Sequence, residues 1–152
     1  MSPRARRNEH VVEDRAVAES DSLVDMAGGV VLLDHVEETA HEQNLPNIRT
    51  VLASEYDPRI PEKVDLVLIC DTLHQIKDPG GYLKDLTRYL KDSARVAVID
   101  YEKNWPSRFD SGKFTVKQLD GWMRSAGCRR DEVFHFLKDN FFIVYRFHGP
   151  SS

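Results

Sequence analysis

The sequence predicts an α/β domain built on a mostly parallel β-sheet, with helices on both faces and an antiparallel hairpin at its carboxyl end. Three observations predict this fold class. Short β-rich apolar runs alternate with helical patterns along the chain, which is typical of strand-helix-strand units. The run Val64–Cys70 is apolar except at Asp65, as expected of a strand buried on both faces. The runs Val133–Leu137 and Phe141–Phe147 are joined by too few residues for a crossover helix, so they form a hairpin.

The amino-terminal elements follow from apolar runs and turn residues. Residues 1–21 mix charges of both signs without strand or helix periodicity, which predicts a mobile tail. A short amphipathic helix at Glu9–Ala18 is the alternative. The domain is expected to span residues 22–148. Its first elements are, in order, a strand at Val30–Leu33, a helix at His35–Asn44, a strand at Ile48–Ala53 and a loop at Ser54–Lys63 that contains two prolines.

The later elements carry clearer signals at their ends. Asp78-Pro79 opens a helix, and its apolar positions recur at three- and four-residue spacing: Tyr82, Leu83, Leu86, Tyr89 and Leu90. A buried strand is predicted at Arg95–Ile99. Thr115 and Gln118 have the spacing of a capping box for the next helix, whose inner face carries Leu119, Trp122, Met123 and Ala126. Gly127 supplies its carboxyl cap.

Composition excludes several classes of function. The net charge of -4 gives no basic field that would attract nucleic acid or an anionic membrane. No apolar run approaches the roughly 20 residues of a membrane span, and no signal peptide follows the amino end, so we expect a cytoplasmic protein. Cys70 and Cys128 are expected to be reduced core thiols. The histidines are scattered, and the spacing of His35 and His41 is not that of a helical metal pair, so no metal site is predicted.

Strand ends are the place to look for active residues. In a parallel α/β sheet, ligands bind at the carboxyl ends of the strands, where the strand order reverses. On the predicted strands these ends are Asp34, Ala53–Asp57, Asp71–Gln75 and Asp100–Trp105.

The residues around these ends resemble a known family. Val64–Ile76, which ends in Asp71-Thr72-Leu73-His74-Gln75-Ile76, together with Tyr82-Leu83 and Arg95–Asp100, is similar to class I S-adenosylmethionine-dependent methyltransferases, and most similar to their small-molecule branch. Leu45–Ile48, Asp57–Pro61 and the closing hairpin fit the same pattern. The resemblance covers about Asp34 to Phe147. It implies a Rossmann-like sheet, S-adenosylmethionine as cofactor and a small-molecule substrate as methyl acceptor.

The resemblance also implies roles for individual residues. Asp34 matches the acidic residue that accepts hydrogen bonds from the cofactor's ribose hydroxyls, although it could instead cap the helix that follows. Ser54 and Glu55 fall near the adenine contact. Asp71 and Thr72 lie beside the reactive end of the cofactor, unless they only terminate the strand.

Three further residues are candidates on the acceptor side. His74 is a candidate base on a hydroxyl or thiol, with a purely structural histidine as the alternative. Tyr101 and Trp105 either line an acceptor pocket or cover the edge of the sheet.

The segment before Asp34 departs from the family pattern. A glycine-rich turn and a helix should separate the first two strands, but Gly28-Gly29 runs directly into Val30–Leu33. A parallel crossover needs a dozen or more residues, so the first helix is expected to be missing or degenerate and the fold to be truncated at its amino end.

Two functions remain open from this departure. Either Gly28-Gly29 forms a reduced cofactor cradle in a working methyltransferase, or the chain is an inactive binding or oligomerisation module, with an open sheet edge that favours a homo-oligomer. A nicotinamide-dependent dehydrogenase does not fit, because the GxGxxG fingerprint is absent.

Overall fold

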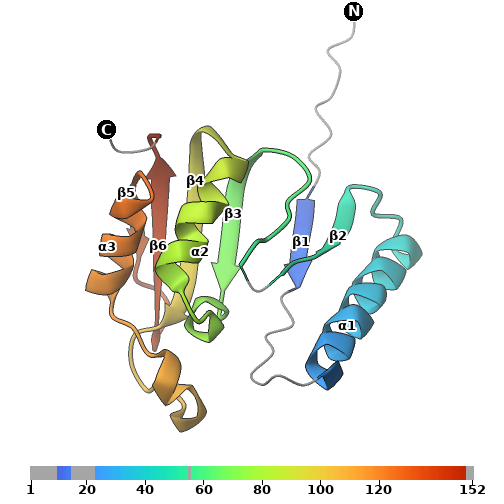
Figure 1. Cartoon of the computed structure of the whole chain (residues 1–152), viewed down its shortest axis with the longest axis horizontal. Coiled ribbons are helices and arrows are strands. Elements are labelled where there is room, and N and C mark those ends of the chain that lie inside the picture. The colour runs from blue at the N-terminus through green and yellow to red at the C-terminus, as the bar shows by residue number, and fades with distance from the viewer. Residues whose placement is uncertain (1–9, 15–22, 55, 150–152) are drawn as a thin grey trace, which may run out of the picture. The chain divides into compact units, whose positions relative to one another are not determined.

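The computed structural model describes residues 10–14, 23–54 and 56–149, with side chains from residue 33 onward (Figure 1). The chain divides into two units, an amino-terminal unit within residues 1–60 and a carboxyl-terminal unit within residues 61–152. No described helix is long and apolar enough to cross a membrane.

The amino-terminal unit is a strand-helix-strand motif. Strand β1 (His10–Asp14) pairs in parallel with β2 (Ile48–Leu52), in a register that runs from His10 opposite Ile48 to Asp14 opposite Leu52. Helix α1 (Leu23–Glu42) lies between them in the chain and contacts β2. Because parallel neighbours need a long crossover, α1 is what allows β1 and β2 to pair.

The expected strand at Val30–Leu33 is wrong, since these residues lie inside α1. A run of four apolar residues cannot distinguish a strand from a buried helical turn. The longer pattern favours the helix: Leu33 and Ala40, two helical turns apart, are both buried. Gly28-Gly29 is therefore helical backbone and does not form the expected turn, at a cost of roughly 1 kcal/mol per glycine relative to alanine.

Strand β1 also corrects the expectation for residues 1–21. His10–Asp14 falls within the predicted mobile tail and its helical alternative, but it is an extended strand. The segment is too short to show the alternation of apolar and polar residues that marks a strand. It pairs with β2, whose residues lie 38 positions later in the sequence. Helix α1, with 20 residues, joins the two strands of this unit.

The carboxyl-terminal unit contains a four-stranded mixed sheet in the order β3-β4-β6-β5. Its strands are β3 (Val64–Cys70), β4 (Leu90–Tyr101), β5 (Cys128–Phe134) and β6 (Asn140–Phe147). β3 and β4 are parallel, whereas β6 runs antiparallel to both β4 and β5. The parallel pair and a closing hairpin are as predicted, but the first hairpin strand was expected at Val133–Leu137 and β5 lies earlier, at Cys128–Phe134.

Two helices of this unit begin where their capping residues indicated. Asp78 accepts a hydrogen bond from the backbone N–H of Gly81 at the start of α2 (Pro79–Leu86). Thr115 and Gln118 form both bonds of the capping box of α3 (Val116–Ser125), and Gly127 follows α3 with a φ of 79°.

Helices α2 and α3 lie side by side on the sheet (Figure 1). The most deeply buried large apolar side chains of this unit are Leu73, Leu83, Leu86, Leu90, Val96, Val98, Leu119, Met123, Ile143 and Tyr145.

Strand β3 is less buried than its composition predicts. Leu66 and Leu68 are 52% and 60% exposed, and only Ile69 is fully buried along the strand. Near-continuous apolar character predicts burial on both faces, but alternate residues of β3 leave one face open. Both cysteines are free, as predicted. Cys128 is buried, whereas Cys70 at the end of β3 is exposed and does not belong to the core.

Candidate functional site

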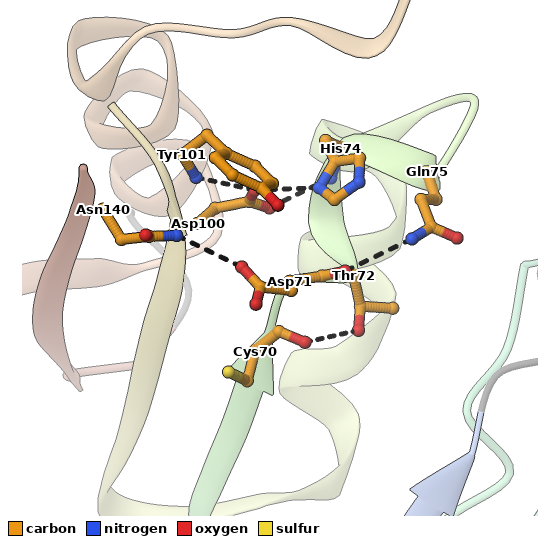
Figure 2. A network of polar contacts seen from close by, with 8 residues as sticks. All are labelled: Cys70, Asp71, Thr72, His74, Gln75, Asp100, Tyr101 and Asn140. Atoms are coloured by element: carbon orange, nitrogen blue, oxygen red, sulfur yellow. Dashed lines mark hydrogen bonds and ion pairs between the residues drawn. The ribbon is translucent and has the colours of Figure 1, made fainter. Parts of the chain in front are cut away.

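The candidate site lies where β3 and β4 end. Because these strands are parallel, Cys70 is opposite Ile99 and both strands end at the same edge, where the backbone N–H of Asp71 donates to the Ile99 carbonyl at 2.9 Å. β6 runs the other way, so its first residue, Asn140, lies opposite Tyr101. The topology thus places Asp71, Thr72, His74, Asp100 and Asn140 together, and we call them the strand-end site (Figure 2).

Asp71 has an unusual backbone conformation. Its φ of 50° is in the left-handed region, which aspartate tolerates better than most residues but which remains uncommon outside glycine. The Asn140 side-chain amide donates to Asp71 Oδ1 at 3.3 Å, and the Gln75 amide donates to the Asp71 carbonyl at 3.3 Å. Thr72 Oγ1 donates to the Cys70 carbonyl at 2.8 Å. These contacts hold an exposed carboxylate in a fixed turn.

The surroundings of Asp71 disfavour a negative charge on its carboxyl group. Partial burial raises the pKa of the Asp71 carboxyl above its ordinary 3.8, and the negative charge of Asp100 raises this pKa further, while His74 lowers it. The strand-end site is therefore a place where an added cation would be favourable.

His74 and Asp100 form a buried pair. His74 Nδ1 lies 2.8 Å from Asp100 Oδ1, and the His74 backbone N–H donates to Asp100 Oδ2 at 3.2 Å. The Tyr101 backbone N–H adds a third bond to Oδ1 at 2.8 Å. The side chains of His74 and Asp100 are 1% and 0% exposed. The pair ties the 3₁₀ turn Leu73–Gln75, which follows β3, to the end of β4.

Aromatic rings surround the other side of the His74 ring. Their centroids lie 5.8 Å (Tyr101), 5.7 Å (Trp105) and 4.2 Å (Phe109) from that of His74. Phe109 belongs to the 3₁₀ segment Ser107–Gly112, which covers the histidine. His74 Nε2 is buried without a hydrogen-bond partner among the residues that the structure describes.

A groove of about 490 Å³ adjoins this cluster. Tyr101 and Trp105 line it together with Phe114 and the first turn of α3. Tyr101 and Trp105 therefore both contact the His74 ring and form part of a surface hollow.

The structure brings together some of the sequence-predicted residues and not others. Asp71, Thr72 and His74 meet at the strand-end site. Gly28, Gly29, Asp34 and Ser54 all belong to the amino-terminal unit, and Glu55 lies outside the described residues.

The local structure of that unit changes how its residues can be interpreted. Asp34 is an exposed residue in the middle of α1, so it neither ends a strand nor caps a helix. Ser54 closes a turn by accepting a hydrogen bond from the Asp57 backbone N–H at 3.0 Å. The role implied for Gly28 and Gly29 depends on a turn that α1 replaces.

Sequence reasoning missed Asn140 and Phe109, and it did not pair His74 with Asp100. The rule that active residues follow parallel strands did point to Asp71–Gln75 and Asp100–Trp105. Asn140 begins an antiparallel strand, and that rule does not apply to antiparallel strands. The register of the hairpin could have indicated Asn140, but no sequence pattern around Phe109 indicates that this residue belongs to the site.

The residues present fit part of the cofactor that the resemblance implies. Asp71 offers an exposed acceptor for an amino group, in surroundings that favour a cation. A glycine-rich cradle between a strand and a helix is not found among the described residues. Over the same residues, no group of three or more histidine, cysteine, aspartate or glutamate side chains could hold a metal ion.

Neither a protein-family model nor a curated protein sequence matches the chain. Its fold does match solved structures. A SAM-dependent methyltransferase from Aquifex aeolicus matches with a TM-score of 0.64 and 22% identity over 76% of this chain and 63% of that one. The mitomycin 7-O-methyltransferase MmcR matches with a TM-score of 0.63 and 15% identity over 77% of this chain and 39% of that one.

A third match is the O-methyltransferase NcsB1 from neocarzinostatin biosynthesis, in complex with S-adenosyl-L-homocysteine and 1,4-dihydroxy-2-naphthoic acid. It has a TM-score of 0.62 and 14% identity over 76% of this chain and 39% of that one. The chain thus spans less than two thirds of each of these enzymes. The resemblance carried by Val64–Ile76 is confirmed in the architecture: this chain has the α/β fold of S-adenosylmethionine-dependent small-molecule methyltransferases.

Proposed function

We propose that this chain binds S-adenosylmethionine and takes part in methyl transfer to a small-molecule acceptor at the strand-end site. The observation that carries the proposal is Asp71, an exposed carboxylate held in a left-handed turn at the carboxyl end of β3. A non-glycine residue in this conformation, fixed by side-chain bonds, is a feature that often accompanies a functional site. Its position is where ligands bind in sheets of this type.

The charge at the strand-end site suits this cofactor. S-adenosylmethionine supplies a methyl group already activated on a positively charged sulfonium, and it also carries an ammonium group. Asp71 and Asp100 repel each other as like charges, which a bound cation relieves. Asp71 would accept the hydrogen bonds of the ammonium group, and Thr72 would flank it.

The contacts to the rest of the cofactor remain predictions from the resemblance. Ser54 and Glu55 would contact the adenine, whereas the ribose role implied for Asp34 assumed a position at the end of a strand and Asp34 lies inside α1. Gly28 and Gly29 would act only if the backbone of α1 opened around them, because helical N–H groups are already bonded within the helix.

The groove beside Tyr101 and Trp105 would hold the acceptor. Its aromatic walls suit a flat, partly apolar molecule. A hydroxyl or thiol acceptor must lose a proton, and His74 Nε2 is the candidate atom to take it. Because the His74 side chain is only 1% exposed, the covering segment Ser107–Gly112 has to move before His74 can touch an acceptor.

A second function, that of an inactive binding or oligomerisation module, is favoured by the exposed face of β3. Leu66 and Leu68 place two large apolar side chains on one side of that strand. Such a patch suits association with another chain better than contact with water. A homo-oligomer would bury these leucines, and Leu68→Lys would then shift the elution of the protein towards the monomer in size-exclusion chromatography.

Isothermal titration with S-adenosylhomocysteine tests the proposed function. We expect saturable binding in the micromolar range, and about tenfold or greater weakening in Asp71→Asn, because a hydrogen bond to a charged group is worth roughly 1.5–3 kcal/mol. Asp92→Asn, which changes an exposed carboxylate of β4, is the matched control and should bind like the wild type. Absence of heat at millimolar ligand would leave the module as the better explanation. Equal affinity of Asp71→Asn and the wild type would show that Asp71 does not contact the ligand.

A further inference from the structure

The sheet of the carboxyl-terminal unit has two edge strands, and they differ in how they are protected. Strand β5 forms one edge, and it carries four consecutive charged residues, Arg129–Glu132. Its register against β6 is also interrupted between Arg130 and Glu132. Charged side chains and bulges are the features by which natural sheets keep an edge from pairing with another strand. The β5 edge therefore has the features of an edge that faces water.

Strand β3 forms the other edge and lacks this protection. Among the described strands it pairs with β4 alone, and its register against β4 is continuous from Leu66 to Cys70. Asp65 is the one charged residue of the seven, and its carboxylate is already paired with Lys91 at 2.8 Å. Leu66 and Leu68 are 52% and 60% exposed. An apolar edge strand of this length is a ready template for a further strand.

The backbone groups on the free edge of β3 belong to alternate residues. The Asp71 N–H points to β4, where it donates to a carbonyl. Because successive residues of a strand direct their backbone groups to opposite edges, those of Leu66, Leu68 and Cys70 point to the free edge. The Cys70 carbonyl already accepts a hydrogen bond from Thr72 Oγ1 at 2.8 Å. Leu66 and Leu68 therefore supply the N–H and C=O groups that another strand could bond.

We propose that β3 pairs antiparallel with β3 of a second copy of this chain, with Val67 opposite Val67 on a twofold axis. The pairing joins two four-stranded sheets into one continuous sheet, by the addition of a strand at an open edge. It goes beyond methyl transfer and does not rest on cofactor binding. It also assigns self-association to one edge and one register, in place of a general apolar contact.

The sequence of β3 complements itself in this register. Leu66 of one copy lies opposite Leu68 of the other on the same face of the sheet, so four exposed leucines cover one another. Exposed charges at the two ends match as well. Lys63, which precedes the strand, lies opposite Asp71, which follows it. All seven residues of β3 have a partner in the second copy.

Other registers fit less well. A register centred on Leu68 places Asp65 opposite Asp71, and like charges directly opposite each other are destabilising. A register centred on Leu66 leaves the last two residues of β3 beyond the end of the second strand. A slip by a single residue would turn the leucines of the two copies to opposite faces.

Disulfide cross-linking of the full chain tests the register. The two Val67 residues would form a non-hydrogen-bonded pair with Cα atoms about 4.5 Å apart, which is within reach of a disulfide. Cys70→Ser provides the background, because it removes the exposed thiol and leaves the buried Cys128 in place. We expect Val67→Cys in this background to form, on oxidation with diamide, a covalent dimer of twice the 17.5 kDa of one chain.

Asp65→Cys in the same background is the matched control. Asp65 lies two residues before Val67 on the same face of β3 and is more exposed. In the proposed register the two Asp65 positions lie roughly 14 Å apart, at about 3.4 Å per residue, which is too far for a disulfide. This variant should remain monomeric on a non-reducing gel.

A second pair of variants separates backbone pairing from simple contact between apolar side chains. Leu68→Pro removes an N–H that points away from β4, so the sheet should stay intact while the edge can no longer pair. Leu68→Thr loses the same leucine but keeps the N–H. In sedimentation velocity we expect a monomer for Leu68→Pro and a dimer for Leu68→Thr, with circular dichroism as the check on folding.

The cross-linking result decides the proposal even if Leu68→Pro does not fold. A Val67→Cys variant that stays monomeric on oxidation would overturn the pairing, and cross-linking of Asp65→Cys to the same extent would overturn the register. Titration with S-adenosylhomocysteine on the same samples distinguishes this proposal from the proposed function. Binding without cross-linking overturns the pairing alone, whereas cross-linking without binding overturns the proposed function alone.

Discussion

A single methyl group added at Gly112 should disturb the cover over His74. An ideal Cβ at Gly112 would lie 1.9 Å from the carbonyl oxygen of His74 and 3.0 Å from its carbonyl carbon. Both are backbone atoms, and the His74 backbone N–H is bonded to Asp100. Neither chain segment can therefore yield by a simple side-chain rotation. We expect Gly112→Ala to lower the free energy of unfolding by about 1–3 kcal/mol, the usual cost of overpacking.

Gly121→Ala is the matched control because it adds the same methyl group in open space. Gly121 lies inside α3, and apart from its chain neighbours and the backbone of the helix itself nothing lies within 4 Å of its ideal Cβ. Alanine in place of glycine within a helix should raise the free energy of unfolding by about 0.5–1 kcal/mol. The two substitutions should thus have opposite signs.

Urea unfolding, followed by far-ultraviolet circular dichroism and tryptophan fluorescence, measures both effects. Trp105 packs against His74, so the native fluorescence of Gly112→Ala should also change if the segment Ser107–Gly112 moves away. The close packing of this segment on His74 would be refuted if Gly112→Ala were as stable as the wild type while Gly121→Ala behaved as expected.

Two more predictions concern stability outside the site. Thr115→Ala removes the capping bond that Thr115 Oγ1 accepts from the Gln118 backbone N–H and should cost about 1 kcal/mol in urea unfolding. An unchanged midpoint would show that this bond contributes nothing. Burial raises the pKa of the Cys128 thiol from 9.0 to about 11, so the unfolded chain loses this proton first as the pH rises. The stability advantage of the wild type over Cys128→Ala should therefore be complete below about pH 9 and shrink by up to about 2 kcal/mol towards about pH 11. A stability difference between the wild type and Cys128→Ala that stays constant across that pH range, measured by urea unfolding at each pH, would contradict a raised pKa of Cys128.

The elements of the carboxyl-terminal unit are predictable because their signals are local. A capping aspartate before a proline, a capping box and a terminal glycine each determine a helix end through bonds within a few residues, as Asp78, Thr115 and Gly127 show. The hairpin follows from a linker too short for any other connection. The sequence predicts only the second half of α1, as the helix at His35–Asn44, because the apolar run Val30–Leu33 before it has the composition of a strand.

The site is predictable as a region but not as a set of contacts. The strand-end rule locates Asp71 and His74, since it depends only on where parallel strands stop. Asp100 is 26 positions from His74, and the contact between them depends on the register of β3 against β4. That register follows from the packing of the whole sheet, and no local pattern encodes it.

The position of β6 determines when the site can form during folding. β6 is the last strand of the sheet along the chain, yet it lies between β4 and β5, and it brings Asn140 to Asp71 across 69 positions of sequence. Contacts between residues so far apart form slowly, because the intervening chain must first lose its entropy. While β6 is still inside the ribosome, the nascent chain lacks both the bond from Asn140 and the strand that pairs with one edge of β4. The strand-end site is therefore completed only after β6 has emerged.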